Sequence, residues 1–153
     1  MRRTATALLL LTTLATPSGA ADTPVGGIDP SKAWTQATTS ATGDAPLYMT
    51  ITNRASVPDS LLRIRCPTDL ADFTVKHATD RGEGGTAMRE VKSFEIPAGG
   101  TLTLAPGGDH LMLLSVRQPF HQGDTFTCSL VFKTAGTVTV AVTVAAADAT
   151  AAP

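Results

Sequence analysis

The sequence predicts an all-β protein, an antiparallel β-sandwich or Greek-key barrel, on three observations. Apolar residues recur with a period of two over much of the chain, which places alternate side chains on opposite faces of a strand. Turns that contain glycine or proline separate these segments at short intervals. No segment shows the spacing of a helix that buries one face. Short strands with regular turns are typical of sandwiches and barrels.

The expected strands follow one another between Trp34 and Val144. Over residues 47–52, Leu47, Met49 and Ile51 alternate with polar or aromatic neighbours, which predicts a strand with one buried face. Further alternating segments lie at 62–66, 73–77, 102–104, 110–114, 126–132 and 138–144. Turns are expected at 97–100, 106–108 and 122–124, where glycine is frequent.

The composition divides the chain into four parts. Residues 1–20 are typical of an export signal, because a basic start and a short apolar run precede small residues that end at Ala20. Residues 21–33 are expected to be a flexible lead-in, residues 34–144 a single domain, and residues 145–153 a disordered Ala-rich tail. No cysteine stands at the expected cleavage point, so we expect a periplasmic protein without a membrane anchor.

The charge and cysteine content exclude some classes of partner and site. Removal of Arg2 and Arg3 with the signal changes the formal net charge from −1 to −3, which gives no reason to expect nucleic acid as a partner. Cys66 and Cys128 are the only cysteines and both fall on the apolar phase of their segments. In an oxidising compartment they are expected to form one disulfide; two buried free thiols are the alternative.

Two histidines and two methionines have a spacing that suits one soft metal ion. His77 is followed after ten residues by Met88, and after twenty-one more by His110-Leu111-Met112. The chain outside the signal has only one other histidine, His121, and one other methionine, both expected to have no metal role. Imidazole nitrogen and thioether sulfur without carboxylate or thiolate favour Cu(I) over zinc, calcium or magnesium.

The expected strands bring these residues together in two pairs. His110 and Met112 are two residues apart in one strand and therefore share a face. If a two-residue turn forms at residues 82–83, His77 and Met88 become directly opposed partners of a hairpin. If the turn is at residues 84–85, that register slips. Blue-copper, hydrolase and nucleotide-binding patterns are not found, because the required cysteine, nucleophile and phosphate-loop motifs are missing from the sequence.

Several segments carry a family resemblance. Residues 47–53, 96–101, 104–113 and 118–126 resemble the periplasmic copper chaperones called PCuAC, and the His–Met spacing at His77, Met88, His110 and Met112 is similar to that family's copper motif. The resemblance implies a cupredoxin-like β-sandwich. It also implies a carrier of Cu(I), one ion per chain, for the assembly of cytochrome c oxidase.

The resemblance sets the functional expectations. We expect a monomeric metallochaperone, not an enzyme, which delivers copper to the dinuclear site of cytochrome c oxidase subunit II, directly or through a Sco-type protein. Two alternatives stay open. One is a periplasmic copper-resistance or sequestration protein, and the other is a secreted β-sandwich interaction module with no metal role.

Overall fold

The computed structural model describes residues 26–82 and 85–153, and within them the regular structure consists of ten strands and no helix. No helix in these two ranges is long and apolar enough to cross a membrane. The strands are β1 (Ile28–Gln36), β2 (Ala45–Asn53), β3 (Asp59–Arg65), β4 (Ala71–Gly82), β5 (Gly85–Glu90), β6 (Phe94–Ile96), β7 (Thr101–Leu104), β8 (His110–Val116), β9 (Thr125–Phe132) and β10 (Thr137–Ala145).

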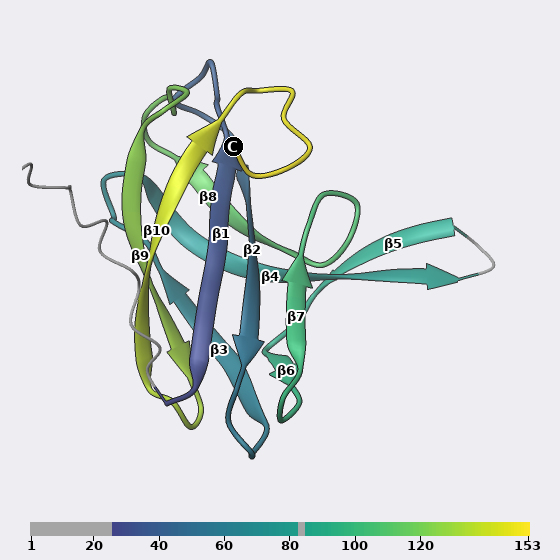
Figure 1. The fold of residues 1–153 in the computed structure, drawn as a ribbon. Coiled ribbons are helices and arrows are strands. Elements are labelled where there is room, and N and C mark those ends of the chain that lie inside the picture. The colour runs from purple at the N-terminus through teal and green to yellow at the C-terminus, as the bar shows by residue number, and fades with distance from the viewer. Residues whose placement is uncertain (1–25, 83–84) are drawn as a thin grey trace, which may run out of the picture.

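The strands form one continuous, curled sheet. Its order is β5-β4-β8-β2-β1-β10-β9-β3-β6, and β7 pairs with β2 beside this path. The sheet curls until β3 approaches β4, where the Lys76 ammonium donates a hydrogen bond to the Leu62 carbonyl oxygen at 2.8 Å. In Figure 1 the β4–β5 hairpin extends away from the curled body. The predicted all-β class is confirmed, with one difference in direction: β1 and β10 run parallel.

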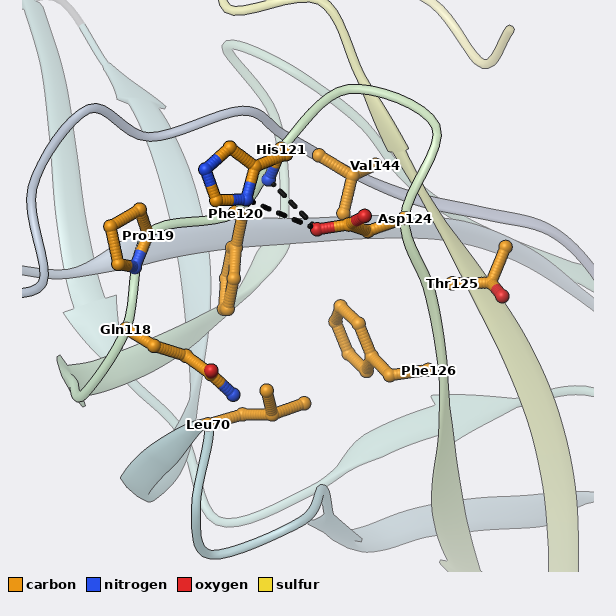
Figure 2. Close-up of a pocket in the computed structure, with 9 residues that line it drawn as sticks. All are labelled: Leu70, Gln118, Pro119, Phe120, His121, Asp124, Thr125, Phe126 and Val144. Carbon is orange, nitrogen blue, oxygen red and sulfur yellow. Dashed lines mark hydrogen bonds and ion pairs between the residues drawn. The ribbon is translucent and has the colours of Figure 1, made fainter.

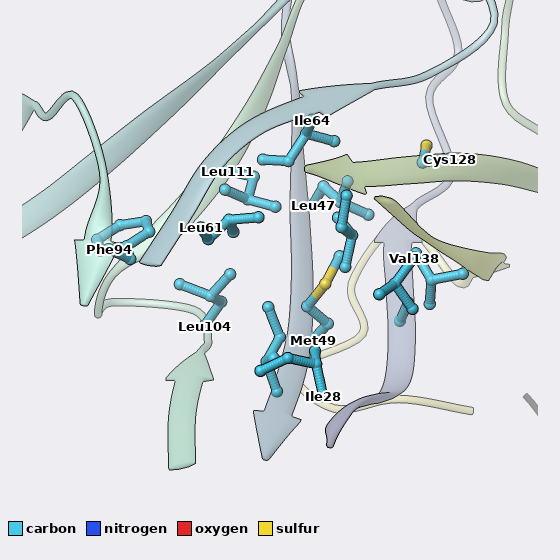
Figure 3. Packing of buried hydrophobic residues seen from close by; sticks show 14 of the residues in the cluster. Ile28, Leu47, Met49, Leu61, Ile64, Phe94, Leu104, Leu111, Cys128 and Val138 are labelled. Carbon is cyan, nitrogen blue, oxygen red and sulfur yellow. The ribbon is translucent and has the colours of Figure 1, made fainter. Parts of the chain in front are cut away.

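The core fills the interior of the curled sheet (Figure 3). In β10 the alternating valines Val138, Val140, Val142 and Val144 are each at most 3% exposed, as the period of two predicts. Burial of each such side chain contributes about 1.5–3 kcal/mol to stability. Met49 is 2% exposed in the same core, which explains this methionine as a packing residue.

The N-terminal boundary differs from the expectation. Residues 21–33 were expected to be a flexible lead-in, but β1 begins at Ile28, which is fully buried. A bulge between Ser31 and Trp34, with Lys32 at φ 52°, interrupts the alternation of buried and exposed side chains. A search for a period of two therefore does not detect the first part of this strand. The expected signal at 1–20 lies outside the described residues.

The C-terminal segment also differs from the expected disordered tail. Ala145 belongs to β10, and the residues that follow have no strand of their own but return to the sheet. Ala149 and Ala152 lie against the cluster that contains Trp34, and the Gln36 side-chain amide donates to the Ala149 carbonyl oxygen at 2.9 Å. Apolar contact with an aromatic side chain therefore holds this segment in place.

The predicted disulfide between Cys66 and Cys128 is present, with their Cα atoms 4.3 Å apart. It joins β9 to the residue that follows β3. Both cysteines are engaged in this bond, so neither thiol is available to ligate a metal.

Candidate metal site

The four predicted metal residues lie on the outer face of β5, β4 and β8. His77 is directly opposite His110, Met112 is opposite Val75, and Met88 is opposite Thr79. Directly opposed residues share a face of an antiparallel pair, and so do residues two apart in one strand. The other face of β8 carries Leu111 and Leu113, both fully buried in the core. The register therefore gathers two imidazoles and two thioethers on the side of the sheet away from the core.

The hairpin register differs from both alternatives that the sequence suggested. Gly82 pairs with Gly85, so the connection is at residues 83–84, which lie outside the described residues. Met88 faces Thr79 and not His77, whose partner on β5 is Glu90. The slip is two residues, which keeps the side chains on the same face because the period of a strand is two. Gly85 has φ 110°, a conformation that glycine adopts without steric cost.

His110 is held with one ring nitrogen available. The residue is 7% exposed, and its Nδ1 lies 2.8 Å from the Gly108 carbonyl oxygen. A carbonyl oxygen only accepts, so Nδ1 carries the proton and donates it. Nε2 then keeps its lone pair, and this is the form in which imidazole binds a metal.

His77 has a buried nitrogen without a partner. Its ring lies at 5.3 Å from that of His110, with the planes at 85°. Among the described residues nothing hydrogen-bonds its Nδ1, although this atom is buried. An unpaired buried polar atom costs about 1–3 kcal/mol. A metal ion bound at the histidine pair fits this arrangement, because it would take up a lone pair that the protein leaves unused.

The methionines differ in accessibility. Met112 is half-buried on β8, whereas Met88 is 63% exposed on the projecting hairpin. A small pocket of about 170 Å³ lies between Met88 and His110, and its lining residues are Tyr48, Thr79, Thr86, Met88, Gly107, Gly108 and His110. Within this pocket one predicted thioether and one predicted imidazole come together beside the exposed hairpin.

Tyr48 lines the pocket beside His110, and Trp34 packs against Tyr48. The Tyr48 ring lies 6.3 Å from that of His110, and the Trp34 ring lies 4.7 Å from that of Tyr48. Burial raises the pKa of the Tyr48 phenol above its usual value of 10.0, so the group stays neutral beside the site. Sequence reasoning missed Tyr48, because its place beside His110 depends on the β2–β8 register.

Hydrogen bonds attach the hairpin to the loop between β7 and β8. The Asp109 carboxylate accepts from the Thr79 backbone N–H at 2.8 Å, and the Thr79 hydroxyl donates to the Gly108 carbonyl oxygen at 2.7 Å. Arg81 donates to the Gly107 carbonyl oxygen at 2.8 Å. These contacts align Met88 with His110. Sequence reasoning did not identify Thr79 or Asp109 as part of the site either; it gives residues 106–108 as a turn and residues 104–113 as part of the family resemblance.

The donor set suits a soft cation. Within residues 26–82 and 85–153, no three histidine, cysteine or carboxylate side chains form a group that could hold a metal ion. A paired imidazole with nearby thioethers matches the preference of Cu(I) for soft, neutral donors. The assignment of His77, Met88, His110 and Met112 as ligands stays a prediction.

His121 lies in a different pocket, of about 300 Å³, which Figure 2 shows. Its side chain is 76% exposed and its Nδ1 lies 3.5 Å from the Asp124 carboxylate. Phe120 and Phe126 form part of the lining, and none of the four predicted metal residues takes part. Among the residues that line this pocket there is no second metal-binding side chain of the imidazole or thioether kind.

The chain matches a described protein family over most of its length. A family described as "Putative lipoprotein LpqE-like" matches residues 28–144. The putative lipoprotein Lxx21020 of Leifsonia xyli subsp. xyli is 35% identical over 130 residues, 84% of this chain and 74% of that protein.

Solved structures of PCuAC domains share the fold. The apo PmoF2 PCuAC domain has 28% identity and a TM-score of 0.71, covering 84% of this chain and 98% of that one. The copper-bound PmoF2 domain has 27% identity and a TM-score of 0.68, with coverage of 82% and 97%. CuI-DR1885 from Deinococcus radiodurans has 33% identity and a TM-score of 0.60, with coverage of 84% and 83%.

The fold and the outer His–Met face together define a PCuAC-type domain. Within that class, the chain belongs to the LpqE-like family.

Proposed function

We propose that this protein is a copper chaperone, not an enzyme, which binds one Cu(I) ion through His77, Met88, His110 and Met112. The observation that carries the proposal is the directly opposed pair of His77 and His110, with one buried unpaired nitrogen and one Nε2 left free by the Gly108 carbonyl. Two structural neighbours, the PmoF2 domain and DR1885, are described as copper-bound and CuI forms.

The proposed task is delivery in the periplasm to the dinuclear copper site of cytochrome c oxidase subunit II, directly or through a Sco-type protein. A monomer with one exposed thioether is suited to this task, because an incoming ligand can reach the metal beside Met88. A disulfide supports an exported location, since such bonds persist in oxidising compartments. The lipoprotein description of the family also fits export.

Titration of the purified protein with Cu(I) against a competing chelator tests the binding step. We expect one ion per chain, and loss of a ligand in His110→Ala or Met88→Ala should weaken affinity by about tenfold or more. Met88→Ala should leave the fold intact because the side chain is 63% exposed. His121→Ala and Met49→Leu serve as controls that should keep the affinity. Two ions per chain, or unchanged affinity in His110→Ala, would contradict the site.

Transfer assays separate delivery from storage. The Cu(I)-loaded protein is mixed with the apo soluble domain of oxidase subunit II or of a Sco-type protein, and the metal is followed after separation. Movement of copper to either domain supports delivery. Retention on this chain with both domains indicates sequestration, and no Cu(I) binding at all indicates an interaction module.

A further inference from the structure

An apolar strip leads along the sheet to the histidine pair. Three consecutive same-face pairs of β4 and β8 are Phe73 with Leu114, Val75 with Met112, and His77 with His110. We name the first two pairs the apolar strip. Phe73 is 67% exposed, and the other three side chains of the strip are half-buried.

The fold does not account for this strip. The core lies on the opposite face, where Leu111 and Leu113 are fully buried. Isolated exposed apolar residues are ordinary on a protein surface, but a contiguous patch beside polar residues marks an interaction site. A phenylalanine that buries its ring on binding removes about 150–250 Å² from water, which makes Phe73 a suitable anchor.

A groove with positive charge borders the strip. It lies between β3 and β4, measures about 560 Å³, and includes Phe73 in its lining. Three cationic side chains line it, Arg63, Arg65 and Lys76, against one carboxylate, Asp72. Asp72 is already paired with Arg117, whereas the exposed Arg63 and Arg65 make no salt bridge with any described residue. This surface is therefore basic although the chain has a formal net charge of −1.

We propose that the apolar strip, with Arg63 and Arg65 at its border, is the surface on which the copper-accepting protein docks; this inference rests on the proposed chaperone function. The partner has an apolar patch beside its own soft metal ligands and carboxylates at the patch border. Two features indicate this occupant: the strip is continuous with the metal site, and its unpaired guanidinium groups attract acidic partners. Docking there brings the partner's ligands to His77, His110 and Met88.

The metal then moves by ligand exchange. A donor atom of the partner forms a bond to Cu(I) as the bond to the exposed Met88 thioether breaks. Further donor atoms of the partner then replace Met112, His77 and His110 one at a time, until Cu(I) is bound by the partner alone. The copper remains Cu(I), so no electron is transferred. The arginines accelerate the encounter, and the apolar contact around Phe73 lengthens the life of the complex.

The test compares transfer to proteins with transfer to a small neutral chelator. Cu(I)-loaded wild type, Phe73→Ser and Arg65→Glu are mixed with the apo soluble domain of oxidase subunit II, with that of a Sco-type protein, or with neocuproine. Val57→Ser, at a 50% exposed apolar residue, and Lys32→Glu, at an exposed cation on β1, are matched controls. Cu(I) affinity is measured for every variant.

We expect Phe73→Ser and Arg65→Glu to slow transfer to the accepting protein by about tenfold, while affinity and transfer to neocuproine stay near wild type. Salt should slow protein transfer for wild type but much less for Arg65→Glu. Protein transfer that proceeds at the wild-type rate in both variants overturns the docking surface alone. Copper that reaches neither protein from wild type overturns delivery, and the docking surface with it. Dimerisation of wild type that Phe73→Ser abolishes assigns the strip to a second copy and also overturns the proposal.

Discussion

Two imidazoles that face each other across β4 and β8 are held in different ways. His110 donates from Nδ1 to the Gly108 carbonyl, whereas His77 has a buried Nδ1 without a hydrogen-bond partner among the described residues. The Gly108 carbonyl also accepts from Thr79, so one short loop orients the predicted ligand His110 and the hairpin together. Small changes in this loop should therefore alter the affinity for the metal.

Asp109 is expected to support Cu(I) binding without contacting the metal. Its carboxylate accepts from the Thr79 N–H and belongs to the loop that orients His110, but it is not a predicted ligand. Asp109→Ala should weaken Cu(I) affinity by about tenfold, because residues that hold ligands in place typically have effects of this size. Asp109→Asn keeps an oxygen acceptor and should remain closer to wild type. Chelator competition measures both, and equal affinity in Asp109→Ala and wild type would contradict the role.

The candidate ligands could be selected from the sequence, whereas the residues that surround and orient them could not. His77, Met88, His110 and Met112 stand out because histidine and methionine are scarce, and because the alternation of strands fixes a face. Tyr48, Thr79 and Asp109 enter the site through the order and register of strands that are distant in sequence. No local pattern specifies that order.

At the scale of elements, departures from the period of two explain where prediction failed. The bulge in β1 breaks the alternation, and the hairpin register depends on a connection with several adjacent glycines. The alternation of β10 is unbroken, and there prediction and structure agree. Where strand pairing is regular, the sequence thus predicts which side chains face the core. Where the backbone is irregular, it does not predict the first residue of a strand or the pairing register.

Asp59, at the start of β3, is expected to stabilise the fold through hydrogen bonds to the backbone. Its buried carboxylate accepts from the backbone N–H groups of Ser60, Thr134 and Ala135 at 2.7–2.8 Å. Burial alone would raise the pKa of Asp59, but these hydrogen bonds together with one from the Thr134 side chain lower it below the usual 3.8. Asp59→Ala leaves the buried Ser60 N–H and the part-buried Thr134 and Ala135 N–H groups without their acceptor, and should cost about 1–3 kcal/mol of stability at pH 7.

The stability that Asp59 contributes should decrease as pH falls. A carboxyl with a lowered pKa in the folded state stabilises the protein above its unfolded pKa. That contribution is lost as pH falls through the lower pKa of the folded state, so the effect lies below about pH 4. Urea denaturation from pH 7 to pH 3 should show a smaller loss of stability in Asp59→Asn than in wild type. Parallel curves for the two proteins would contradict this account.

At the scale of the whole molecule, the two surfaces of the curled sheet differ in the residues that they carry. The inner surface holds the core, and the outer surface of β5, β4 and β8 holds His77, His110, Met88 and the apolar strip that includes Met112. The curl brings β3 close to β4, and the disulfide secures the end of β3 to β9 beside the resulting groove. Stability and metal binding should therefore respond to different changes.

The disulfide provides the test of that separation. Its two cysteines are 62 residues apart, and closing such a loop stabilises the fold by about 4 kcal/mol on the chain-entropy model. The variant Cys66→Ser with Cys128→Ala avoids free thiols, which would themselves bind Cu(I). Its free energy of unfolding, from urea denaturation, should fall by about that amount, while its Cu(I) affinity at a temperature where it remains folded should match wild type. A folded double variant that has lost Cu(I) affinity would contradict the separation, because the disulfide would then position the outer face as well as the core.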